Sequence, residues 1–146
     1  MFKVIRDRYY SIKDGVSNLI KWLPIIWSDR DWDQEYLYII VHKKLEHMEE
    51  FFRSDNTFTA EAISVADEIK EAKDLLYNKI NSTHTSKVDF DTREFIHLDN
   101  NKLNIDRSDG NYEAWLQSMN AAEIQETSDM KRSFDIIANK SKGWWD

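Results

Sequence analysis

The chain has 146 residues, no cysteine and a formal net charge of −7. This length suits one domain that buries its core without crosslinks, and the missing cysteines exclude a disulfide framework and a thiolate metal site or nucleophile. The negative charge disfavours duplex nucleic acid as a ligand, because lysine and arginine supply most of the affinity for phosphates. Residues 19–27 are too few to span a bilayer, so we expect no export and no membrane.

Helices are expected throughout, because three glycines and one proline leave little material for the tight turns of a β protein. The first predicted helix covers residues 9–22 and is ended by Pro24. Its apolar residues recur at helical spacing: Tyr9, Ile12, Val16, Leu19, Ile20 and Trp22. Basic residues crowd this end of the chain: Lys3, Arg6, Arg8, Lys13 and Lys21.

A second helix is predicted over residues 32–53, where Asp31 can cap the start and Gln34 can reach back as in a capping box. A third is predicted over residues 60–81, with Thr59 as its cap. Together they form a long antiparallel pair. The expected inner stripe of the second helix is Leu37, Val41, Leu45, Met48 and Phe52, and that of the third is Ala62, Val65, Ala66, Ile69, Ala72, Leu76 and Ile80.

Periodicity fails around residues 82–110, which we expect to form an irregular insertion or a short β-hairpin between residues 87–91 and 102–106. Asp109-Gly110-Asn111 then starts a last helix that runs to about residue 139. Glu123 and Glu126 fall near its inner stripe, where an unpaired carboxylate is costly to bury. We therefore expect one of three things: the helix breaks there, a basic residue near the N-terminus pairs with these carboxylates, or this stretch faces a partner chain. The predicted fold is one all-α domain over residues 1–146.

The aromatic-acidic block, residues 27–33, reads Trp27-Ser28-Asp29-Arg30-Asp31-Trp32-Asp33. With Trp22-Leu23-Pro24-Ile25-Ile26 before it, Lys43-Lys44-Leu45-Glu46 after it and a C-terminal Gly143-Trp144-Trp145-Asp146, it resembles a family of small phage-encoded proteins. They carry a near-identical PIIW-x-DRDWD block and often end in the same four residues. The resemblance covers residues 16–80 and 130–146. It implies a phage accessory protein acting in the bacterial host cytoplasm, and it names no reaction.

Two interpretations of the block are open. In the structural one, an aspartate caps the helix, Arg30 pairs with an acid, and the indoles seal a helix junction. In the functional one, an indole stacks on a base-like ring and Arg30 meets a phosphate, although the neighbouring acids weaken this. We expect the C-terminal tryptophans to dock on the segment from Pro24 to Trp32. The candidate ligand-binding residues are Trp27, Arg30, Asp31, Trp32, Asp33, Trp144 and Trp145.

An alternative site lies in the carboxylates Glu46, Glu49, Glu71 and Asp74. Their spacing matches the loose E-x-x-E and E-x-x-D pattern with which all-α nucleotide pyrophosphatases of the MazG type hold Mg²⁺, an ion that prefers oxygen ligands. The helical wheel argues against it, because Glu71 and Asp74 fall opposite the inner stripe of their helix.

The sequence therefore favours a non-catalytic accessory protein without a cofactor. Its expected partner is a nucleotide-like signal or a host or defence protein, and self-association into a homo-oligomer is expected. A Mg²⁺-dependent nucleoside triphosphate pyrophosphatase is the first alternative. A minor virion or assembly component is the second.

Overall fold

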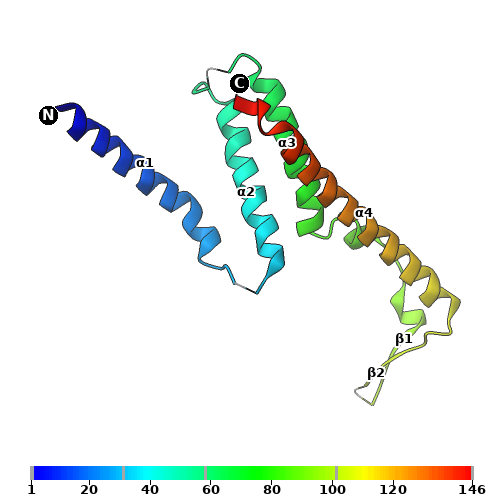
Figure 1. Ribbon diagram of the computed structural model, residues 1–146. Coiled ribbons are helices and arrows are strands. Elements are labelled where there is room, and N and C mark those ends of the chain that lie inside the picture. Colours follow the sequence, from blue (N-terminus) through cyan, green and yellow to red (C-terminus); the bar gives the residue numbers. More distant parts are fainter. Residues whose placement is uncertain (1, 31, 58, 101, 146) are drawn as a thin grey trace. The chain divides into compact units, whose positions relative to one another are not determined.

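The computed structural model describes residues 2–30, 32–57, 59–100 and 102–145, with side chains described from residue 8 onward. Helices dominate the described chain, which confirms the all-α fold with a short hairpin (Figure 1). The helices are α1 (Phe2–Ile26), α2 (Gln34–Arg53), α3 (Ala62–Ile80) and α4 (Gly110–Lys140). The strands are β1 (Ile96–Asp99) and β2 (Lys102–Ile105), and 3₁₀ turns occur at Thr85–Lys87, Thr92–Glu94 and Gly143–Trp145.

The chain divides into two compact units, Met1–Val41 and His42–Asp146. Helix α2 runs through the boundary between them without a break. The single domain expected over residues 1–146 stays a prediction, and each unit is described by itself. Within the described residues, none of the helices combines the length and the apolar character needed to cross a membrane.

Helix α1 extends beyond the predicted span at both ends, and Pro24 lies inside it. A proline removes one helical amide and crowds the carbonyl four residues earlier, so we expected the helix to end there. The amides that follow still find partners, because Trp27 N donates to Leu23 O at 3.0 Å and Ser28 N donates to Ile25 O at 3.3 Å. Pro24 therefore precedes the end of α1 by less than one turn.

Helix α2 begins two residues later than predicted, at Gln34. Its cap is Asp33, whose Oδ1 accepts a hydrogen bond from Glu35 N at 3.0 Å. This bond satisfies one of the amides that the first turn leaves without a helical partner. The predicted cap, Asp31, lies outside the described residues. Helix α3 also begins later than predicted, and Glu61, not Thr59, precedes its first residue and makes no side-chain cap.

In the second unit, the end of α2 and helix α3 run antiparallel, as predicted. Two contacts fix the direction: Glu49 pairs with Lys73 at 2.5 Å, and further along α2 Arg53 pairs with Asp67 at 2.7 Å. The predicted inner stripe of α3 is buried at Val65, Ala66, Ile69, Ala72 and Leu76. On α2 the stripe is buried at Leu45 and Phe52, whereas Leu37 is exposed.

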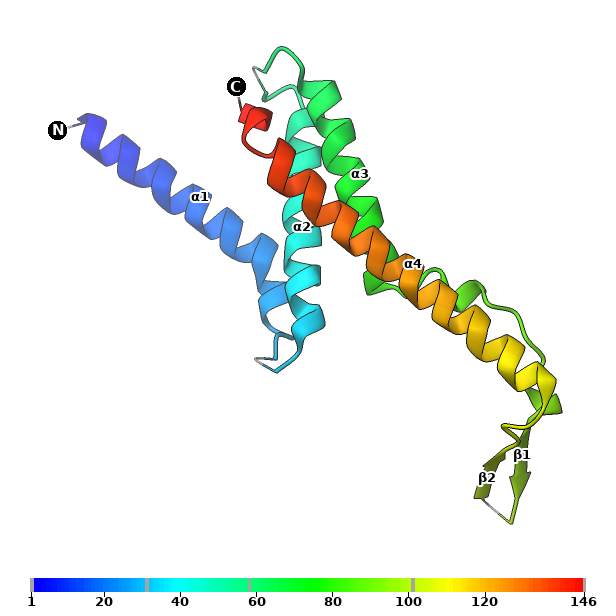
Figure 2. The same cartoon turned by 45° about the vertical axis from the view of Figure 1, so that its right-hand side comes forward.

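Helix α4 packs along α3, also antiparallel (Figures 1 and 2). At the close approach Ser133 is fully buried, and its Oγ donates to the Ala72 carbonyl at 2.7 Å. Small residues on both helices allow this approach. Nearer the C-terminus Lys140 pairs with Glu68 at 3.1 Å. The start of α4 matches the prediction, because Asp109 accepts from Asn111 N at 2.7 Å.

The hairpin has one predicted strand and one unpredicted strand. β2 falls within the expected residues 102–106, but it pairs with β1 and not with residues 87–91. The connection is two residues long, and Asn100 adopts a φ of 48°, which asparagine tolerates in a tight turn. A two-residue turn pairs the residues directly before it with those directly after it. Residues 96–99 therefore form the first strand, in place of the predicted residues 87–91.

Two isoleucines of α3 provide a matched test of this core. Ile69 is 0% exposed, whereas Ile63 is 60% exposed on the same helix. We predict that Ile69→Ala lowers the free energy of unfolding by about 2–5 kcal/mol, because it opens a cavity. Ile63→Ala should change it by less than about 1 kcal/mol. Urea unfolding followed by circular dichroism measures both, and equal losses would contradict the assigned core.

Candidate functional site

The aromatic-acidic block connects α1 to α2 in the first unit. Its two indoles are the most exposed large apolar side chains of the described residues, with Trp27 78% and Trp32 82% exposed. Arg30 folds back locally, because its Nη1 donates to the Asp29 carbonyl at 2.9 Å. Asp33 is engaged as the cap of α2. The block is therefore partly architecture, through Asp33, and partly an exposed surface, through the two indoles.

This arrangement is open on the solvent side. Small-molecule sites are usually concave, with most of the ligand surface covered. A hollow on α4 is lined by none of the block's residues. A planar ligand stacked on Trp27 or Trp32 would keep one face in water. Large exposed indoles are instead typical of protein contact surfaces, where tryptophan is enriched among the residues that dominate affinity.

The C-terminal tryptophans have a different environment, in the second unit. Trp144 is 2% exposed, and its Nε1 donates to Glu68 Oε2 at 3.0 Å. The ring of Trp145 lies 4.9 Å from that of Phe52 and 6.0 Å from that of Phe51, measured between centroids. The contacts described for Trp144 and Trp145 are thus with Glu68, Phe51 and Phe52. Docking was predicted on the segment from Pro24 to Trp32.

Trp144 is accordingly a core side chain and not an open ligand surface. Its indole N–H needs a hydrogen-bond acceptor when the ring is buried, and Glu68 supplies one while it also accepts from Lys140 at 3.1 Å. Both donors lower the pKa of the Glu68 carboxyl. The last residues are thereby anchored to α3, where a chain end would otherwise fray. The sequence identified a docked tail but not its partner.

Each of the four alternative metal ligands has its own cation. Glu46 pairs with Lys43, Asp74 with Lys70, and Glu71 with Arg132 of α4. Glu49 is shared between Lys73 at 2.5 Å and Arg53 at 2.9 Å. Among the described residues, no three histidine, aspartate or glutamate side chains form a group that could hold a metal ion.

Glu49 shows how these pairs act. Burial alone would raise the pKa of its carboxyl, but the hydrogen bonds from Lys73 and Arg53 outweigh burial and lower it. Glu49 thus stays ionised as a link between α2 and α3. Its position beside the inner stripe was predicted correctly, and its partners make it part of the helix packing.

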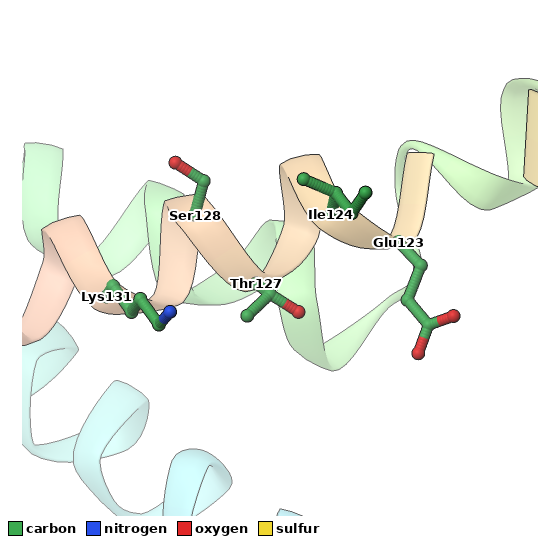
Figure 3. A pocket seen from close by; sticks show the side chains of 5 residues that line it. All are labelled: Glu123, Ile124, Thr127, Ser128 and Lys131. Atoms are coloured by element: carbon green, nitrogen blue, oxygen red, sulfur yellow. The ribbon is translucent and has the colours of Figure 1, made fainter. Parts of the chain in front are cut away.

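The hollow on α4 is open and has a volume of ≈ 400 Å³. Figure 3 shows Ile124 and Ser128 on one side of the helix and Glu123, Thr127 and Lys131 on the other. Because the five lining side chains come from one helix and do not converge, they do not form a built ligand site.

The structure contains a buried carboxylate cluster that the sequence did not resolve. Glu126 is 2% exposed, and its Oε1 accepts from His84 N at 3.2 Å, Thr85 N at 3.0 Å and Thr85 Oγ1 at 2.9 Å. The predicted break in the helix is therefore wrong, and the hydrogen bonds described for Glu126 come from His84 and Thr85. Backbone amides of the segment after α3 supply the hydrogen bonds, and α4 stays unbroken.

Asp129, one turn further along α4, completes the cluster. It is 7% exposed and accepts from Asn78 at 2.7 Å, His84 at 2.8 Å and Gln125 at 2.9 Å. Burial would raise the pKa of this carboxyl, but the three hydrogen bonds outweigh burial and lower it. The sequence placed Glu126, but not Asp129, near the inner stripe of the last helix. The partners of Asp129 lie on α3 (Asn78), on α4 (Gln125) and in the aperiodic segment after α3 (His84).

Comparisons with protein-family models, with curated proteins and with solved structures found no match for this chain. The chain is a helical protein with two exposed tryptophans between α1 and α2 (the aromatic corner), and with two buried carboxylates, Glu126 and Asp129, that join α4 to the end of α3 and the segment after it.

The hydrogen-bonded Asp129 carboxylate should stabilise the folded protein to an extent that depends on pH. Because the folded-state pKa is lowered, the stabilisation is complete above the unfolded value of about 3.9 and is lost as the pH falls through the folded value. At pH 7 we expect Asp129→Asn to lower the free energy of unfolding by about 1.5–3 kcal/mol, since it removes charge-assisted hydrogen bonds. The difference from the parent protein should shrink at acidic pH.

Asp135→Asn is the matched control, because Asp135 is exposed on the same helix. Its unfolding free energy should stay within about 0.5 kcal/mol of the parent value. If the loss of unfolding free energy in Asp129→Asn does not change with pH, the Asp129 carboxylate is not ionised in the folded protein and the assignment is wrong.

Proposed function

We propose that this chain is a non-catalytic phage accessory protein that acts by binding a host or defence protein. The observation that carries the proposal is the exposure of Trp27 and Trp32, 78% and 82%, on the connection between α1 and α2. Two indoles cost free energy in water, and a protein partner that covers them recovers it. The phage and host context comes from the resemblance of the sequence motifs and is part of the proposal.

A protein partner is favoured over a nucleotide-like signal by the shape and charge of the corner. A protein can cover both faces of an exposed indole, whereas a nucleotide needs a cavity to hold it. Asp29 and Asp31 flank Arg30 in the sequence, and two carboxylates beside one guanidinium weaken its attraction for phosphate. Under this proposal the corner is a contact surface whose aromatic residues supply most of the affinity.

A binding function is also favoured over the pyrophosphatase. Metal-assisted attack on a triphosphate needs carboxylates that converge on one ion. Glu49 and Glu71 pair across helices, with Lys73 and Arg132, whereas Asp74 pairs with Lys70 on its own helix. The three carboxylates thus have separate cationic partners.

The test is affinity capture by the tagged full-length protein from phage-infected bacterial cells. We predict a host protein whose recovery falls about 30-fold or more in Trp27→Ala/Trp32→Ala, because truncating a contact tryptophan costs about 2 kcal/mol or more. Trp145→Ala, an exposed tryptophan of the second unit, is the control and should retain recovery. Binding of the purified candidate is then measured directly.

Two outcomes would contradict the proposal. One is a set of captured proteins that does not change in the double variant. The other is a rise in melting temperature with nucleotides or cyclic dinucleotides that disappears in Trp32→Ala, which would assign the corner to a small-molecule signal.

A further inference from the structure

Helix α1 carries a strict heptad pattern. Its apolar residues alternate spacings of three and four through Tyr9, Ile12, Val16, Leu19, Leu23 and Ile26, and the sequence continues the spacing back to Phe2 and Ile5. These are the a and d positions of a coiled coil, with Tyr9, Val16 and Leu23 at a. Pro24 falls at b, outside the stripe.

Within the described part of the first unit, the stripe is uncovered. Its six described members are between 44% and 67% exposed, and none of the α1 side chains described, residues 8–26, is buried. An isolated helix is marginal in water, and most helical stability in proteins comes from packing of the apolar face. The stripe therefore needs a cover.

The spacing indicates what kind of surface covers it. A straight α-helix drifts by about 20° per heptad from a strict seven-residue repeat, so a stripe that keeps the repeat stays in contact only with another helix that coils around it. A flat surface, such as a lipid headgroup layer, suits a broad face of period 3.6. The pattern of α1 runs for more than three heptads, with Tyr10, Ile20 and Trp22 outside the a and d positions.

The flanks of the stripe indicate the charge of the partner. In the first half, the positions beside the seam hold Arg8 at g and Lys13 at e, and the sequence adds Arg6 at e. In the second half they hold Ile20 and Trp22. Five basic and two acidic side chains give α1 a net charge of +3 in a chain of net charge −7.

Such flanks disfavour parallel pairing of α1 with a second copy of itself. That pairing sets g of one helix against the next e of its partner, which would place Arg8 opposite Lys13 twice per dimer. Isoleucine at d, as in Ile12 and Ile26, also departs from the leucine that parallel dimers prefer there. A helix with acidic flanks makes the opposite contacts favourable.

We propose that α1 forms a coiled coil with a helix of the protein partner, and that this helix has an apolar a/d seam with acidic flanks opposite Arg8 and Lys13. The inference rests on the proposed function and names the chemistry of its partner. It also extends the contact surface, because the stripe ends at Ile26, next to Trp27 of the aromatic corner.

The test uses two synthetic helical peptides of four heptads, both with leucine at a and d. One has glutamate at every e and g position, and the other has lysine there. Binding to the full-length protein is followed by fluorescence anisotropy. We expect the acidic peptide to bind at least about 10-fold more tightly, since its glutamates pair with basic flanks that repel the lysine peptide. Raising the salt concentration should reduce the preference.

Variants locate the contact. Leu19→Asp should abolish binding of the acidic peptide, and Arg8→Glu/Lys13→Glu should reverse the preference between the peptides. Lys21→Glu, at an f position away from the seam, is the matched control and should leave binding within about 3-fold, because exposed charges away from a contact contribute little. All four sites are exposed on α1, so circular dichroism should show the helices of the second unit intact.

Three results would overturn the inference: equal binding of both peptides, self-association of the protein that Leu19→Asp removes while the acidic peptide does not compete, or Leu19-dependent binding to phosphatidylglycerol vesicles with no peptide binding. These are distinguishable from a failure of the proposed function. If the captured host protein depends on Trp27 and Trp32 but not on Leu19, the corner binds the partner and the coiled coil is wrong.

Discussion

An amphipathic helix in water needs a surface that covers its apolar face, and α1 is such a helix with no buried side chain among residues 8–26. Backbone hydrogen bonds alone stabilise a helix of this length only marginally. The second unit meets the same requirement internally, because five apolar residues of α3 are buried there. The second unit thus packs its own apolar residues, whereas the first unit leaves the apolar stripe of α1 without an internal cover, and the functional proposals follow from this difference.

The packed part is held by polar contacts as much as by its apolar core. Glu126 and Asp129 are buried on α4, and both accept hydrogen bonds from His84, through its backbone amide and its ring. Each buried carboxylate would be costly without these donors. The cluster fixes the chain after α3 against α4, and at the other end of the helix pair Glu68 receives the indole N–H of Trp144. Both ends of the pair are thus closed by a carboxylate.

The sequence predicted what periodicity controls and missed what depends on distant partners. Five of the seven residues predicted for the inner stripe of α3 are buried, because a 3.6-residue period marks a buried face directly. The cap described for α2 is Asp33, whereas Asp31 was predicted, because three aspartates in five residues offer equivalent caps. The first strand and the hydrogen-bond partners of Glu126 were missed, because residues 81–95 carry no period that assigns them a neighbour.

The candidate site was predicted in part. The block of residues 27–33 was identified from composition alone, and Trp27 and Trp32 are exposed there. Composition could not separate them from Trp144, which is buried, since an indole serves a core and an interface equally well. Only the exposed fraction distinguishes a core indole from an interface indole. That fraction depends on tertiary packing, which composition does not report. The heptad of α1 was visible in the sequence, but its meaning depended on finding the stripe uncovered.

Hydrogen–deuterium exchange on the purified protein, at several protein concentrations, tests the central claim most directly. Amide protection reports the free energy of local opening. If the apolar face of α1 is uncovered, amides of residues 8–26 should exchange orders of magnitude faster than those of residues 65–76, with no dependence on protein concentration. Protection of α1 equal to that of α3 in the protein alone would show that its face is already covered, and would contradict the account.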